Sequence, residues 1–331
     1  MFSLRTKTDF QTKNRSHGIF FLVALCFFLI PTRISDAAQW PSSQGPVQAI
    51  SVSANPQGEN AFLPASADRP LLRIIYAANS HGALFPCPTC GKAYIGGMAK
   101  RATTLRRLQA KGIPVLHIVG AHEFPPDVTP PDPRLTGNLA PKDFQRIYTS
   151  LHPDIVYLSP AAARWFAPGT PGNFLEVDSG PVTHTLHVGG LTVAVILFPD
   201  LDPSSPAPGR SLMTDVLAAA RAAANADIRI GVSPWGFQAE YSVRQALSQA
   251  FHLVLGAGPG APFPLDAAAM APALWTRAAA NGRSLICLDL DTVPPRGCAP
   301  DWIPGLTVHA SEMYLEQNIP DDPAMLELLH P

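Results

Sequence analysis

The sequence predicts an α/β fold whose sheets are covered on both faces. From Leu72 onward, short strand-like segments alternate with longer helix-like ones. Several of the strand-like segments are unbroken apolar runs, which is typical of strands buried on both faces. The chain has 331 residues, of which 47% are hydrophobic and 15% charged, so it can bury a large core.

The expected elements follow in order along the chain. The strands are short runs of apolar and β-branched residues at Leu72–Tyr76, Val115–Val119, Ile155–Leu158, Val182–Val188, Thr192–Phe198, Ile228–Val232, Leu253–Leu255, Ser284–Leu290 and Leu306–Val308. The helices are the segments with helical periodicity at Gly97–Lys111, Pro141–Leu151, Leu212–Ala224, Tyr241–Ala250 and Pro323–Leu329. His184 to Phe198 is expected to form a hairpin that turns at Gly189-Gly190. Proline-rich stretches are expected to form stiffened loops at Pro125 to Arg134, Asp202 to Gly209 and Gly258 to Pro264.

The N-terminal residues have the pattern of an export signal. Basic residues precede an apolar run from Ile19 to Ile30, and the small residues at Ser35-Asp36-Ala37 suit signal peptidase. We expect cleavage after residue 37, a flexible linker over residues 38–70 and a single domain over residues 71–331, in the periplasm or secreted. The alternative is an uncleaved membrane anchor, although this apolar run is shorter than the roughly 20 residues that a spanning helix needs.

The charge pattern argues against nucleic acid as a partner. The net charge is -1 at pH 7, and no run of Lys and Arg occurs beyond the N-terminal segment. Lys100, Arg101, Arg106 and Arg107 form the one notable basic cluster, which we interpret as the solvated face of a helix. A protein or small-molecule ligand is therefore the expected partner, with membrane contact only through an uncleaved signal.

The first strand and helix of the domain carry a recognisable turn. The strand ends in Ala78-Asn79-Ser80-His81-Gly82, and Gly96-Gly97 opens the helix. This order resembles the start of the 5'-nucleotidase branch of the calcineurin-like metallophosphoesterases. In that family the turn reads Asn-Asp-x-His-Gly, where the Asp bridges two metal ions and the His binds one of them. The resemblance implies a two-sheet sandwich flanked by helices, but Asn79 stands at the Asp position.

The later motifs of that family can also be located, each without its metal-binding or catalytic residues. Its Gly-Asp, Gly-Asn-His, Ser-His-x-Gly and Gly-His-x-His motifs correspond to Gly120-Ala121, Ser159-Pro160, Ser233-Pro234-Trp235-Gly236 and Gly256-Ala257-Gly258. Two neighbouring divalent cations repel each other and are held together by bridging carboxylates. Only His81 remains of the usual ligands, so the resemblance carries the fold to this chain and not the activity.

His81 has two possible roles. It can be a hydrogen-bonded residue of a tight turn, which is the interpretation we favour. Alternatively, His81, His122 and Glu123 could form a relocated site for one divalent metal, because the latter two follow the next strand end. No recognised metal-ligand spacing supports such a site, so no metal or other cofactor is expected.

The cysteines offer a second kind of chemistry. Cys87 and Cys90 lie in the loop after the first strand, where some exported relatives of the 5'-nucleotidase type also carry a pair. We expect a structural disulfide in an exported protein; redox exchange or metal binding are the alternatives. Cys287 and Cys298 could form a second disulfide, or one buried and one surface thiol, and a zinc site built from both pairs is a further alternative.

Three functions therefore remain open from the sequence. The first is a catalytically silent, exported binding or accessory module with the metallophosphoesterase fold. The second is a thiol-disulfide or metal-binding protein that uses Cys87 and Cys90, and the third is a residual phosphoester hydrolase with a rearranged site.

Overall fold

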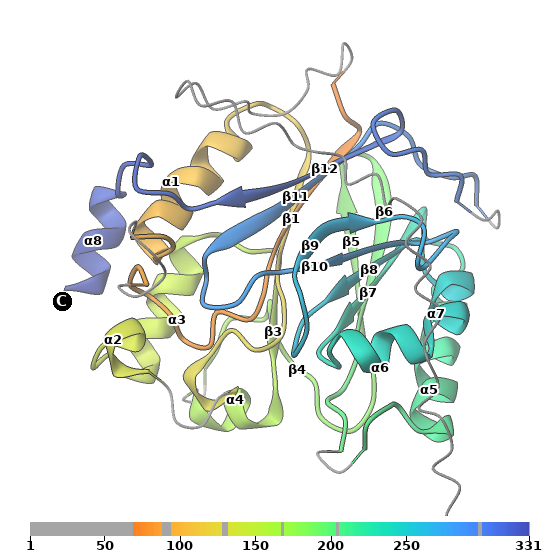
Figure 1. Cartoon of the computed structure of the whole chain (residues 1–331), viewed down its shortest axis with the longest axis horizontal. Coiled ribbons are helices and arrows are strands. Elements are labelled where there is room, and N and C mark those ends of the chain that lie inside the picture. The colour runs from red at the N-terminus through yellow and green to blue at the C-terminus, as the bar shows by residue number, and fades with distance from the viewer. Residues whose placement is uncertain are drawn as a thin grey trace, which may run out of the picture. The chain divides into compact units, whose positions relative to one another are not determined.

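The structure, a computed structural model, describes residues 69–87, 94–127, 132–166, 169–202, 205–296 and 300–330. All of them belong to one compact unit, Asn60–Pro331. Two six-stranded sheets lie face to face within it, as far as the described residues show, and helices cover the outer face of each sheet (Figure 1). This is the α/β two-sheet sandwich that the sequence predicts.

The first sheet contains the initial four strands and the last two. Its strands are β1 (Leu72–Ala77), β2 (Val115–Val119), β3 (Ile155–Leu158), β4 (Phe174–Glu176), β11 (Ser284–Leu290) and β12 (Val308–Tyr314). Their order is β12-β11-β1-β2-β3-β4, with parallel pairing from β1 to β4 and antiparallel pairing from β1 through β11 to β12. The helices on this side of the molecule are α1 (Met98–Gln109), α2 (Pro133–Thr136), α3 (Pro141–Ser150), α4 (Pro160–Trp165) and α8 (Pro323–Leu329).

The second sheet contains the middle of the chain. Its strands are β5 (Val182–Val188), β6 (Leu191–Leu197), β7 (Ile228–Ser233), β8 (Leu253–Gly256), β9 (Phe263–Asp266) and β10 (Leu274–Arg277), in the order β5-β6-β7-β8-β10-β9. Strands β6, β7, β8 and β10 run parallel, and β5 forms the expected hairpin with β6 through Gly189-Gly190. The helices α5 (Arg210–Ala222), α6 (Phe237–Ser242) and α7 (Arg244–Ala250) cover its outer face.

Three apolar layers hold these elements together. Between the sheets, alternate residues such as Ile74 and Leu116 of the first sheet meet Val195 and Val232 of the second. The residues of opposite parity on each strand pack against the helices, as Ile75 does on the first sheet. The inner strands, such as β1, β3, β8 and β11, are buried along their whole length and are therefore mostly apolar, which explains why they were visible in the sequence.

The structure differs from the sequence-based elements in a few places. The helix expected at Tyr241–Ala250 is two short helices, α6 and α7, which meet at Val243, where the backbone leaves helical geometry (φ -114°, ψ 11°). The last strand runs from Val308 to Tyr314 and not over Leu306–Val308. Strands β4, β9 and β10 and helices α2 and α4, each of at most six residues, were not predicted. The expected signal and almost all of the linker, up to residue 68, lie outside the described residues.

Candidate functional site

The loops after several parallel strands meet at one edge of the two sheets. The backbone N–H of Asn79, after β1, donates to the carbonyl of Ala121, after β2. On the second sheet, the N–H of Ala257 after β8 donates to the carbonyl of Ser233 at the end of β7. These loops carry the motif positions of the resemblance, so we call the group formed by Asn79, His81, His122, Pro234 and Gly258 the strand-end site. The carboxyl edge of parallel strands is the usual place for a functional site in such folds.

Asn79 joins the two sheets at this site. Its side-chain Nδ2 donates to the carbonyl of Ala278 at 3.1 Å, and its Oδ1 accepts from the N–H of Gly258 at 2.7 Å. Since one partner can only accept and the other can only donate, this position requires an amide and does not suit a carboxylate. The residue is 4% exposed and adopts a left-handed conformation (φ 60°), which Asn tolerates better than most residues. Both polar ends of the side chain are therefore used in linking protein to protein.

Glu123 is held by internal donors and does not act as a free ligand. Its fully buried carboxylate accepts from Ser80 Oγ at 2.6 Å, Tyr148 OH at 2.9 Å and Arg101 Nη1 at 2.9 Å, and also from the backbone N–H of Ser80. The charge of Arg101 balances that of Glu123 in the interior. The suggestion of Glu123 as a metal ligand is therefore wrong, because its lone pairs already have four donors.

His81 and His122 lie near each other, and the His122 ring is already hydrogen-bonded to the protein. Their ring centroids are 6.1 Å apart, and His122 Nε2 donates to the carbonyl of Pro234 at 3.0 Å. His81 Nδ1 is buried and has no hydrogen-bond partner among the described residues. Burial, and then the adjacent His122, lower the pKa of His81, so its imidazole is neutral near pH 7.

The turn around His81 is closed by its backbone. The N–H of His81 donates to the carbonyl of His122, and the N–H of Gly82 donates to that of Glu123. The expected tight turn is thus present, although these bonds come from the main chain and not from the imidazole. No group of three or more His, Cys, Asp or Glu residues within the described ranges is arranged to hold a metal ion, so His81, His122 and Glu123 do not form the alternative site.

Two tyrosines of the first sheet reach across to the second just below this edge. Tyr76 OH donates to the carbonyl of Gly256 at 3.2 Å, and Tyr157 OH donates to that of Phe198 at 2.9 Å. A Cβ atom on Gly120 would lie only 2.5 Å from the Tyr76 ring, so the motif glycine makes room for this tyrosine. The space between the sheets beneath the strand-end site is therefore filled by side chains of the protein.

A buried ion pair fastens the loop that follows β8. Arg277 Nη1 donates to Glu240 Oε2 at 2.5 Å, while Arg277 Nη2 donates to the carbonyls of Ala257, Gly258 and Pro259. Burial raises the pKa of Glu240 to about 7, against the opposing effect of Arg277. Sequence reasoning missed this pair, because Arg277 lies in the unpredicted strand β10 and no local pattern links it to Glu240.

Ser159 occupies the position of the Gly-Asn-His motif and serves as a helix cap. Its Oγ accepts from the N–H of Ala162 at the start of α4 and donates to Asp127 Oδ1 at 2.5 Å. Burial raises the pKa of Asp127, and burial also raises that of Asp200, which follows β6. The bond between Ser159 and Asp127 joins the loop after β3 to the loop after β2. Apart from the presence of the Asp residues, no pattern in the sequence indicates this contact.

Gly96 and Gly97 are retained for steric reasons. Both have φ of 95°, a conformation that favours glycine. A Cβ on Gly97 would come within 2.9 Å of Pro86, and one on Gly96 would come within 3.0 Å of the carbonyl of Gly282. They allow the first loop to pack closely where α1 begins, so their presence is explained without any ligand.

The cysteine predictions have different outcomes. Cys87 is buried, and its backbone N–H donates to the carbonyl of Ile95. Cys90 lies outside the described residues, so the pairing of Cys87 with Cys90 stays a prediction. Cys287 is a free thiol of β11 that is buried in the apolar layer between the first sheet and its helices, and burial raises its pKa to about 12. The disulfide suggested for Cys287 and Cys298 is wrong, because Cys287 is a free thiol. Cys298 lies outside the described residues.

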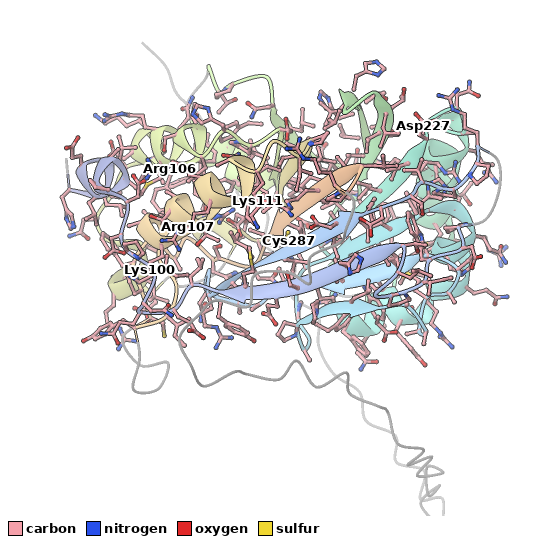
Figure 2. The ribbon with its side chains drawn as sticks, turned by 90° about the horizontal axis from the view of Figure 1, so that it is seen from above. Lys100, Arg106, Arg107, Lys111, Asp227 and Cys287 are labelled. Carbon is pink, nitrogen blue, oxygen red and sulfur yellow. The ribbon has the colours of Figure 1, made fainter. Side chains whose placement is uncertain are left out.

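Half of the basic cluster on α1 is not solvated, contrary to expectation. Arg101 is buried against Glu123, and Lys100 Nζ donates to Asp321 Oδ1 and to the carbonyl of Ile319. Arg106 and Arg107 are exposed on the last turns of the helix (Figure 2). The apolar stems of Lys100 and Arg101 let them lie in the interior while their charges reach acidic partners.

The fold is similar to those of several solved structures. The 5'-nucleotidase precursor from Thermus thermophilus superposes with a TM-score of 0.56 and 14% identity, over 78% of this chain and 57% of that one. The sulfate thiohydrolase SoxB of the same organism gives 0.58 and 14%, over 81% and 60%. The calcineurin-like phosphoesterase YfkN from Bacillus subtilis gives 0.52 and 11%, over 78% and 95%. No protein-family model matches the chain, and no curated protein matches it in sequence.

These similarities establish the fold. The chain has two mixed six-stranded sheets and eight α-helices in its described parts, arranged as in 5'-nucleotidase-type metallophosphoesterases. It spans less than two thirds of the length of the first two structures named above.

The residues at the strand-end site do not fit the two-metal centre that this fold family implies. The amide of Asn79 is used at both ends, Ala121 and Ala257 have no side-chain donor atoms, and Ser159 caps a helix. His81 alone offers an uncommitted ligand atom among these positions. One neutral imidazole without a carboxylate cannot offset the repulsion between two divalent cations.

Proposed function

We propose that this chain is an exported, non-catalytic binding or accessory module built on the metallophosphoesterase fold. The observation that carries the proposal is the cross-link through Asn79, in which an amide joins Gly258 and Ala278 at the position of a bridging carboxylate. The surrounding loops are joined in the same manner by Glu123 with Arg101 and by Arg277 with the carbonyls after β8. The geometry favours a rigid surface made of protein groups over a reactive centre.

The export part of the proposal rests on the N-terminal sequence. No helix in the described part of the chain is long and apolar enough to cross a membrane. Expression of the full chain in a Gram-negative host should yield a periplasmic product that begins near Ala38, as judged by N-terminal sequencing. A product that keeps its N-terminus and sediments with membranes would favour the uncleaved anchor.

The non-catalytic part can be tested with metal binding and hydrolysis together. Protein from residue 38 onward is dialysed separately against manganese, iron and zinc, freed of excess metal and analysed by elemental mass spectrometry. Hydrolysis of a phosphomonoester, a phosphodiester and a nucleoside 5'-monophosphate is then followed with and without chelator. We expect far less than one bound metal per chain and no chelator-sensitive hydrolysis.

Two histidine variants make the test specific. His81→Ala removes the remaining family ligand, and His187→Ala removes an exposed imidazole on the edge strand β5 as the matched control. Stoichiometric metal and chelator-sensitive hydrolysis, both lost in His81→Ala and kept in His187→Ala, would overturn the proposal and establish a rearranged catalytic centre.

A further inference from the structure

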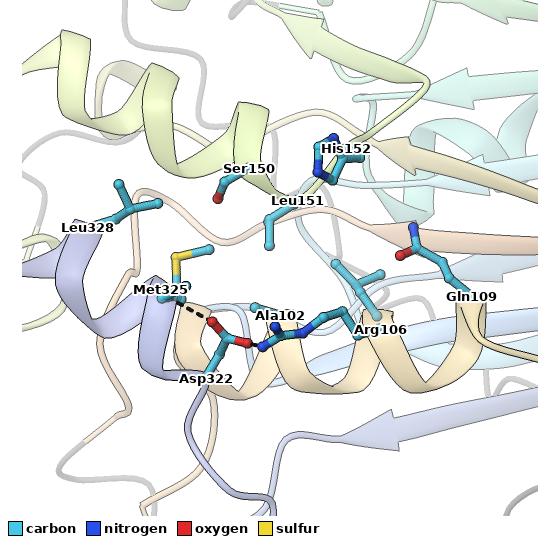
Figure 3. A pocket seen from close by; sticks show the side chains of 11 residues that line it. Ala102, Arg106, Gln109, Ser150, Leu151, His152, Asp322, Met325 and Leu328 are labelled. Atoms are coloured by element: carbon cyan, nitrogen blue, oxygen red, sulfur yellow. Dashed lines mark hydrogen bonds and ion pairs between the residues drawn. The ribbon is translucent and has the colours of Figure 1, made fainter.

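We propose that a cavity on the helical side of the first sheet binds a small organic anion with an apolar body. The cavity has a volume of about 190 Å³ and lies between α1, the end of α3 and α8 (Figure 3). It is separate from the strand-end site, because its lining includes Leu151 and His152, which lie just before β3, whereas Asn79 follows the carboxyl end of β1. The proposal therefore does not depend on what the strand-end site does.

The floor of the cavity is apolar. Leu105, Leu151 and Met325 line it and are buried members of the core between the helices and the first sheet. Ala102 and Leu328 extend this surface from α1 and α8. A dry cavity of about 150 Å³ is large enough for benzene. The space in this chain therefore suits one six-membered ring or an aliphatic chain of similar size.

Polar groups lie around this floor and differ in how far they are already used. Asp322 is 3% exposed, and its Oδ1 accepts from the N–H of Met325 while its other oxygen pairs with Arg106. Ser150 Oγ donates to the carbonyl of Ile147 at 2.7 Å. The charge of Asp322 is thus neutralised within the protein. The Ser150 hydroxyl already donates its hydrogen to Ile147, so it can only accept a hydrogen bond from a ligand while that bond is kept.

The remaining donors favour an anion. The Arg106 side chain is 61% exposed, and a guanidinium has five N–H donors, more than the pairing with Asp322 requires. The Gln109 side-chain amide lines the same cavity. An organic anion with its carboxylate at Arg106 and its apolar body on the floor of the cavity would therefore match both the charged and the apolar parts of the lining.

The test uses two ring compounds of equal size and opposite charge. Binding of 4-fluorobenzoate to the purified chain from residue 38 is measured by fluorine NMR, with 4-fluorobenzylamine as the cationic counterpart. Three variants are compared with the natural chain, and circular dichroism with thermal melting establishes that each is folded. Arg106→Gln removes the cation, Ala324→Leu fills the cavity from the exposed start of α8, and Arg107→Gln makes the same charge change beside the cavity.

We expect 4-fluorobenzoate to bind, with affinity at least tenfold lower in Arg106→Gln and Ala324→Leu and within twofold of the natural chain in Arg107→Gln. The amine should bind at least tenfold more weakly than the benzoate. Failure of the benzoate to bind at millimolar concentration would overturn the proposal. Binding of the amine as tight as that of the benzoate, or an equal loss of affinity in Arg107→Gln, would also overturn it, because binding would then not depend on the charge of Arg106. An unchanged affinity in Ala324→Leu would overturn it by showing that the compound binds outside the cavity.

Discussion

Replacing Asn79 with Asp tests whether the strand-end site is a cross-link or a dormant metal centre. The variant keeps an acceptor for the N–H of Gly258 but loses the donor to the carbonyl of Ala278, and it places a negative charge beside that carbonyl. A buried acceptor left without a partner costs about 1–3 kcal/mol. Asn79 is 4% exposed, so water cannot easily replace the lost partner. We therefore expect the free energy of unfolding at pH 7 to fall by about 1–3 kcal/mol, or roughly 2–10 °C in melting temperature.

The pH dependence of this loss gives the prediction a second signature. A protonated carboxyl can donate to the carbonyl of Ala278 as the amide does, so folding should favour the protonated form and raise the pKa of the introduced group above its unfolded value near 3.9. The variant should be closest to the natural chain below that pH and lose stability as pH rises through its folded pKa. Asn281→Asp is the control, because Asn281 also has a left-handed backbone (φ 61°) but is only partly buried.

Urea unfolding of both variants and of the natural chain, from about pH 3 to pH 8 and with or without millimolar manganese or zinc, measures these effects. The cross-link reasoning expects no rescue by metal. If Asn79→Asp is as stable as the natural chain without metal, or if metal stabilises it by several kcal/mol while leaving Asn281→Asp unchanged, the amide is not the structural element described above.

Three further predictions concern buried groups. Burial raises the folded pKa of Glu240 to about 7. Its contribution to stability is therefore fully present below its unfolded pKa near 4.5 and is lost as pH rises through about 7. Glu240→Gln should flatten that part of the curve of unfolding free energy against pH. Arg101→Met should lower the free energy of unfolding by about 3–5 kcal/mol, because it leaves the Glu123 carboxylate buried without its cation. Arg107→Met on the exposed face should change the free energy of unfolding by less than about 0.5 kcal/mol. Equal effects of the two variants in denaturant titrations would contradict the pairing of Arg101 with Glu123. Cys287 should resist iodoacetamide at pH 8 in the folded chain, because burial raises the pKa of its thiol to about 12. It should react fully in urea, which peptide mass mapping can show. Rapid labelling of the native protein would refute the placement of Cys287 in the core.

The parts of the fold that could be predicted are those whose signal is local. Val115–Val119, Ile155–Leu158, Val182–Val188 and Ser284–Leu290 were predicted with their observed bounds, because a short apolar or alternating run between turn residues identifies a strand without its neighbours. The helix Pro323–Leu329 was also predicted as observed, since Asp322 caps it and proline occupies its first position. Strand β10 was missed because its four residues include Thr276 and Arg277, whose burial depends on partners elsewhere in the chain.

The candidate site divides along the same line. The departures from the family motifs at Asn79, Ala121 and Ser159 were visible in the sequence, because a single residue at a motif position is enough to show each of them. The partners of those residues were not visible. Arg101 and Glu123 are 22 positions apart, and Asn79 and Ala278 are 199 apart, so the sequence contains no periodicity that could reveal either contact. The burial of Lys100 and Arg101 was missed for the same reason, since charged residues on a helix are normally solvated unless they are paired.

The contacts at the strand-end site also explain why a single substitution should not recreate a metal centre. In a two-metal site, ions and carboxylates join the loops that follow the parallel strands. Here the corresponding loops are joined by protein groups: the Asn79 amide connects the turn after β1 to those after β8 and β10, and Arg277 binds three carbonyls in the loop after β8. A carboxylate introduced at position 79 would face the carbonyl of Ala278, and Ala121 and Ala257 would still offer no ligand. Restoring metal affinity therefore requires several simultaneous changes, and the change at position 79 removes a bond that now holds the two sheets together.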